Sequence, residues 1–121
     1  MTITCEIDHR KRLTLVRGSG ELNEQEILEF VDALISDPDF DPSYHFLGDL
    51  TATTKMDVSS DTIQRLARME MFTEDSKRAY VATRRFVFGL LRMMELTAND
   101  PAGNVKVFAD LAEARAWLGL D

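Results

Sequence analysis

The sequence predicts an α/β protein with a mixed, mostly parallel sheet of four to five strands, an N-terminal antiparallel hairpin and four helices. Short apolar segments typical of strands alternate with amphipathic segments of helical spacing. The expected order is β-β-α-β-α-β-α-β-α, and its three successive βα units favour parallel strands joined by helices. The chain has 121 residues, without a linker or an internal repeat. Residues 1–121 are therefore expected to form a single domain.

The chain opens with the expected hairpin. Residues 3–7 and 13–16 alternate apolar and polar side chains on either side of a polar turn. Gly18 and Gly20 are interpreted as a turn that ends the second strand. Asn23 stands where a third glycine would complete a phosphate-binding G-x-G-x-x-G motif, so these glycines do not predict a nucleotide site.

The first helix has a strong start signal at Asn23, because Glu26 follows three residues later and completes a capping box. Its apolar residues recur at helical spacing and predict one buried stripe: Ile27, Phe30, Val31, Leu34 and Ile35. The acidic segment 37–41 that follows does not fit a calcium loop, since Pro42 stands where that loop needs glycine. We therefore expect a turn, and no metal site.

Residues 44–50 read as a buried strand, and residues 51–54 as a hydroxyl-rich loop before a second helix capped by Ser59 or Ser60. The next strand is expected at residues 79–83, and a third helix from Arg85 to about residue 98. A strand at residues 105–108 and a helix capped by Asp110 with Glu113 complete the order.

In open parallel sheets, ligands bind beyond the carboxyl ends of the strands. The candidate ligand-binding residues at that edge are Asp49, Thr51, Thr53, Arg84 and Arg85. Two cations at the start of a helix are mildly unfavourable unless an anion lies near, and that anion would be Asp49 or a ligand. Alternatively, Asp49 and the threonines satisfy local backbone groups, and the arginines point into solvent or pair with Glu74 or Asp75.

The third helix carries more apolar residues than one buried face requires. Val87, Leu90, Leu91 and Met94 form its inward face at ~100° per residue. On a helical wheel, Phe88 falls on the polar side of this helix, between Arg92 and Glu95. The candidate interaction surface is Phe86, Phe88, Arg92, Met93 and Leu96. Either a neighbouring helix covers these residues, or this face meets a partner, a ligand or a membrane surface.

The composition narrows the class of protein. A formal net charge of −7 argues against a nucleic-acid partner, because such interfaces depend on cationic residues. Cys5 is the single cysteine, which favours a reducing compartment and is expected to be buried in the first strand. The N-terminus lacks a secretory signal, and the longest apolar-rich stretch, residues 86–96, is shorter than the ~20 residues of a membrane span. We expect a cytoplasmic protein without a transmembrane segment, although peripheral membrane contact stays open.

No catalytic constellation is evident, so we expect neither an enzyme nor a bound cofactor. Asp49 is a lone carboxylate without a second acid, a metal or a nucleophile beside it. Nothing in the sequence orients Cys5 with His45 as a nucleophile and base. A small hydrolase that uses Asp49 with His45 is the weakest alternative.

The chain resembles the SpoIIAA-like proteins, distant relatives of the STAS domain. The resemblance rests on residues 47–63, on the blocks 78–82 and 88–93, and on the closing residues 107–118. It implies a mixed sheet covered by helices, a bacterial cytoplasmic setting, no established enzymatic activity, and roles in ligand, lipid or protein binding. STAS domains of the anti-sigma antagonist type carry a phosphorylatable serine in Asp-Ser-Ser/Ala-Gly. Here Leu50, Thr51 and Ala52 follow Asp49, so a phosphorylation switch is not expected.

Together these observations predict a non-enzymatic bacterial binding or regulatory module. It would act through protein contacts or self-association as a homodimer, along the third helix. The alternative is a carrier or sensor of an amphipathic ligand, lipid-like or isoprenoid. In that case an anionic head would lie near Arg84, Arg85 and residues 49–54, and the apolar tail would lie under the second and third helices.

Overall fold

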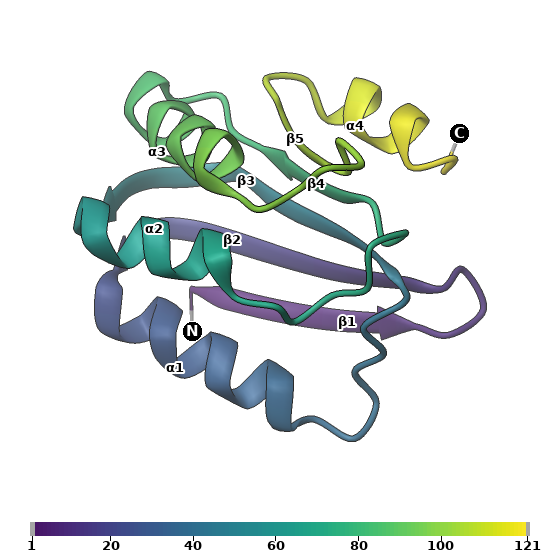
Figure 1. Cartoon of the computed structure of the whole chain (residues 1–121). Coiled ribbons are helices and arrows are strands. Elements are labelled where there is room, and N and C mark those ends of the chain that lie inside the picture. Colours follow the sequence, from purple (N-terminus) through teal and green to yellow (C-terminus); the bar gives the residue numbers. More distant parts are fainter. Residues whose placement is uncertain (1, 121) are drawn as a thin grey trace.

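The computed structural model describes residues 2–120, and it confirms the predicted order of elements (Figure 1). The strands are β1 (Ile3–Asp8), β2 (Leu13–Asn23), β3 (His45–Asp57), β4 (Arg78–Val81) and β5 (Val105–Phe108). The helices are α1 (Glu24–Ser36), α2 (Ser60–Arg68), α3 (Arg85–Thr97) and α4 (Leu111–Trp117).

The five strands form one mixed sheet in the order β1-β2-β3-β4-β5. The pair β1 and β2 is antiparallel, and every other neighbouring pair is parallel, as the hairpin followed by βα units predicted. Figure 1 shows α1, α2 and α3 one above another across one face of this sheet. The short α4 packs on the opposite face, over β3, β4 and β5.

The sheet separates two apolar cores. The main core lies beneath α1, α2 and α3, and it includes the predicted inward face of α3: Val87, Leu90, Leu91 and Met94. The smaller core lies beneath α4, where Ala114 and Leu118 pack against Leu47 and Val81. Because β3 sends successive side chains to opposite faces, Phe46 enters the main core and Leu47 the smaller one.

Two predicted breaks in the strands are wrong. Residues 51–54 are not a loop, because β3 continues to Asp57, and residues 18–20 do not end β2, which runs to Asn23. The pairing instead absorbs two register shifts, one of which places Leu50 and Thr51 opposite Gly18. A Cβ atom on Gly18 would lie 2.7 Å from Cδ2 of Leu50, so glycine there permits close packing rather than a turn.

The helix starts follow the predicted capping chemistry. The backbone N–H of Glu26 donates to Oδ1 of Asn23 at 2.9 Å, and the N–H of Asn23 donates to Oε1 of Glu26 at 3.3 Å, which completes the capping box of α1. Ser59 caps α2 by accepting from the N–H of Thr62. Ser59 also donates its N–H and its hydroxyl to Glu24, and these bonds lower the pKa of Glu24 while joining the starts of α1 and α2.

Candidate functional site

Asp49 and Thr51 lie together in the middle of β3. Oδ1 of Asp49 accepts both the backbone N–H of Thr51, at 3.0 Å, and its hydroxyl, at 2.7 Å. Oδ2 of Asp49 lies 4.0 Å from Nε of Arg17 on the neighbouring strand β2. Asp49 therefore has local hydrogen bonds of the kind expected for a carboxylate that satisfies its own backbone.

Thr53 lies apart from these residues, inside the protein. It is fully buried, and within residues 2–120 its hydroxyl has no hydrogen-bond partner. A Cβ atom on Gly18 would come within 3.1 Å of this hydroxyl, which places Thr53 among the side chains that close over Gly18. The register shifts in β3 are the reason, because they change which side chains face the main core.

The start of α3 lies next to the middle of β3, whereas the sequence predicted a loop at this place, beyond the end of a strand. The hydroxyl of Thr83 donates to the backbone oxygen of Thr51 at 3.4 Å, and Arg84 and Arg85 follow directly. Both arginines are exposed, and in the described part of the chain neither side chain forms an ion pair or hydrogen bond. Residues 74–75, the alternative partners, precede β4 and so lie at its opposite end. The first turn of α3 also lacks an acidic residue.

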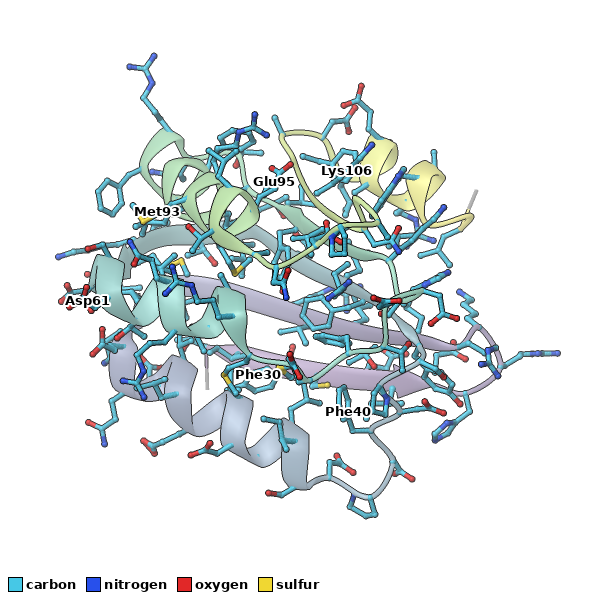
Figure 2. All side chains as sticks on the ribbon, in the orientation of Figure 1. Phe30, Phe40, Asp61, Met93, Glu95 and Lys106 are labelled. Carbon is cyan, nitrogen blue, oxygen red and sulfur yellow. The ribbon has the colours of Figure 1, made fainter. Side chains whose placement is uncertain are left out.

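The outer side of α3 differs from the wheel prediction at one position. Phe88, expected on the polar side, instead packs against the main core, and so does Met93. The reason is that α3 contacts α2 as well as the sheet, which widens its buried arc; Figure 2 shows Met93 on α3 near α2. The exposed apolar residues are Phe86, 66% exposed, and Leu96, 72% exposed. Arg92 is also exposed and pairs with Glu95, with Nη1 2.8 Å from Oε1.

An apolar cavity of about 140 Å³, which the sequence did not reveal, lies between α1, α2 and the sheet. Phe30 of α1 lines it from one side and Ile63 of α2 from another, while Leu50 of β3 forms part of its floor. Figure 2 shows Phe30 between α1 and α2.

Tyr80 and Gly48 shape one side of this cavity. A Cβ atom on Gly48 would lie 3.0 Å from Cδ1 of Tyr80, so the tyrosine ring on β4 lies across the backbone of β3 at this glycine. Burial raises the pKa of Tyr80 to about 12, an effect that Arg78 partly opposes. Tyr80 is half-buried, and its hydroxyl bonds to no residue in the range 2–120 but is not among the buried unpaired oxygens, so it is accessible. Tyr80 is thus the single lining residue with a polar side chain.

The residues considered for catalysis do not assemble. His45 and Asp49 are four residues apart on β3, about 13 Å at ~3.3 Å per residue, so they are not a dyad. Nδ1 of His45 accepts the N–H of Lys77, and burial together with the charge of Lys77 lowers the pKa of His45. Cys5 is exposed and not buried as predicted, because the edge strand β1 is only partly covered by α1. Partial burial and the charge of Asp37 raise the pKa of this thiol, which disfavours the reactive thiolate.

Residues 2–120 contain no group of three or more histidine, cysteine or acidic residues placed to hold a metal ion. No helix in that range has the length and apolar character needed to cross a membrane.

The fold has clear structural relatives, although no family model and no curated protein matches the chain. One relative is an uncharacterized protein of the DUF3478 family, with a SpoIIAA-like fold, from Shewanella loihica PV-4. The two chains are 14% identical, with 96% of this chain and 93% of the other covered and a TM-score of 0.60. Another is an anti-sigma factor antagonist from Mycobacterium paratuberculosis, 17% identical, with 97% and 94% covered and a TM-score of 0.62. The chain therefore has the SpoIIAA-like fold that its sequence suggested.

Proposed function

We propose that the chain is a non-enzymatic regulatory module that acts through protein contacts, with the outer side of α3 as its contact surface. The observation that carries this proposal is the exposure of Phe86 and Leu96 on a helix whose other large apolar residues are packed. At ~100° per residue, Phe86, Gly89 and Leu96 fall within one arc of ~80°, and we call these three residues the outer strip of α3. Phe86 lies in the first turn of α3 and Leu96 in the last, so an exposed apolar side chain stands at each end of this strip, where a partner could cover both.

The fold and the charge support the same proposal. A structural relative is an anti-sigma factor antagonist, a protein whose name describes regulation through another protein. The outer strip lies beside Arg85, whose side chain has no ion pair within residues 2–120, and beside Arg92, which already pairs with Glu95. A second copy of this chain, which has 21 acidic residues, can supply a carboxylate to Arg85, and this makes self-association the first case to test.

Sedimentation velocity over a range of concentrations tests the proposal. We expect the wild type to associate reversibly, and both Phe86→Glu and Leu96→Glu to sediment as monomers, because a carboxylate on the outer strip would be desolvated at the contact. Ile35→Glu is the matched control, since Ile35 is also exposed, at 45%, but lies on α1. A wild type that remains monomeric at every concentration, or association that survives both α3 substitutions, would refute self-association through this strip.

The second candidate is a carrier or sensor of an amphipathic ligand, which the apolar cavity favours. The exposed arginines Arg84 and Arg85 are available to an anionic head, but neither lines the cavity, which lies between α1 and α2. Native mass spectrometry of gently purified protein is the direct test. A protein that carries no bound mass and does not respond to acyl or isoprenoid compounds would contradict this candidate.

A further inference from the structure

We propose that the cavity between α1, α2 and the sheet binds a small, neutral, largely apolar molecule whose single hydrogen-bonding group contacts the hydroxyl of Tyr80. This inference rests on the second candidate above for the presence of a ligand, and it replaces a charged lipid with a compact neutral compound. It does not depend on the outer strip of α3.

The arrangement of the helices accounts for the space. Helix α1 packs on β1 and β2, and α2 packs mainly on α3, so α1 and α2 have few direct contacts with each other. Between them, Gly48 contributes no side chain to the floor, and the ring of Tyr80 lies across that glycine. The cavity is thus built into the way in which these elements pack.

The volume limits the size of the ligand. At about 140 Å³ the cavity is close to the ~150 Å³ apolar cavity that holds benzene in an engineered protein. A single aromatic ring with one small substituent matches this volume, whereas a long acyl chain exceeds it. Met56, Met71 and Met94 line the space, and their flexible thioethers can adjust to the shape of a bound ring.

The side chains that line the cavity determine which class of ligand can bind there. Every lining side chain except that of Tyr80 is apolar, and none is charged. An ion would lose its hydration there without a partner, so a charged ligand is disfavoured. The hydroxyl of Tyr80 bonds to no residue in the range 2–120 and is accessible, so a hydroxyl or carbonyl on the ligand can form a hydrogen bond with it. The high pKa of Tyr80, about 12, keeps this hydroxyl neutral and able to donate at physiological pH.

The test compares two probes of similar shape, toluene and 4-methylphenol, by chemical-shift titration of the methyl groups that line the cavity. We expect both probes to bind saturably, with 4-methylphenol roughly fivefold tighter because it gains one hydrogen bond. Tyr80→Phe should remove this preference and leave the affinity for toluene within about twofold, since the aromatic ring is kept.

Tyr44→Phe is the matched control. Tyr44 is buried outside the cavity, and its hydroxyl is hydrogen-bonded to Nδ1 of His9 at 2.7 Å. This variant should retain the preference for 4-methylphenol. The inference is overturned if neither probe binds saturably to the wild type, or if Tyr80→Phe retains the preference. Charged amphipathic compounds that bind while both neutral probes fail would overturn this inference and leave the carrier candidate standing.

Discussion

Replacing Thr53 by valine should stabilise the protein, because the substitution removes a buried hydroxyl that has no partner. Thr53 is fully buried, and its Oγ1 has no hydrogen-bond partner within residues 2–120. An unpaired buried hydroxyl costs ~1–3 kcal/mol, and the methyl group that replaces it adds up to ~0.8 kcal/mol of apolar burial. Since valine has nearly the same shape as threonine, we expect a net gain of about 1–3 kcal/mol.

Urea unfolding followed by circular dichroism measures this gain. With an m-value of ~1.5 kcal/mol per molar urea, the midpoint should rise by roughly 1 M. Thr62→Val is the matched control, because Thr62 is also buried but its Oγ1 has a hydrogen-bonding neighbour, the Oγ of Ser59 at 3.1 Å. The free energy of unfolding of this control should fall by about 1 kcal/mol, because a hydrogen bond is removed. If Thr53→Val is destabilised as much as Thr62→Val, the hydroxyl of Thr53 has a partner and the reasoning fails.

Three further predictions follow from the caps, a histidine and two glycines. Asn23→Ala should lower the free energy of unfolding, measured with urea, by about 1 kcal/mol, because it removes the capping box of α1. An unchanged urea midpoint would mean that the cap does not stabilise the protein. The lowered pKa of His45 means that the unfolded state binds more protons below pH 6.5, so stability should decrease as the pH falls from 6.5 through the folded pKa. His45→Gln should flatten that decrease in urea titrations carried out below pH 6.5, and an unaltered slope would mean that other groups cause the decrease. Gly18→Ala should lower the free energy of unfolding by about 1–3 kcal/mol, because the added Cβ overpacks the core. Gly89→Ala should raise it by up to ~1 kcal/mol through helix propensity, because no atom lies within 4 Å of the added Cβ. Equal midpoints of the two variants in thermal unfolding would contradict both predictions.

The order of strands and helices could be predicted from the sequence because periodicity and caps are local signals. Asn23 with Glu26 identified the start of α1, and the spacing of apolar residues identified the buried face of α3. Residues 51–54 misled the prediction because threonine suits both loops and strands, and only pairing with β2 decides between them. Gly18 misled it for a similar reason, since a close approach of Leu50 leaves no trace in the neighbouring sequence.

The candidate site was less accessible to sequence reasoning. The neighbourhood of Thr51 and the start of α3 could be predicted only in part, because α3 follows β4, the parallel neighbour of β3, whereas Thr51 lies inside β3 and not beyond its end. The pairing of Asp49 with Arg17 could not, because it depends on the register between β2 and β3. The cavity depends on how far apart two helices lie, and no local pattern encodes that distance. The pairing of Tyr80 with Gly48 on neighbouring strands indicates where the cavity lies, but it too depends on the register of the sheet.

The strand order also bears on how the chain can fold during synthesis. Each strand of the sheet lies beside the strand that precedes it in the chain, so no strand has to enter between two that are already paired. The longest pairing, between β2 and β3, is complete once residue 57 has left the ribosome. The sheet can then grow at a single edge as β4 and β5 emerge, in the order of translation. Force measurements on arrested nascent chains should therefore detect a first folding event at lengths that expose β3, before α3 is available.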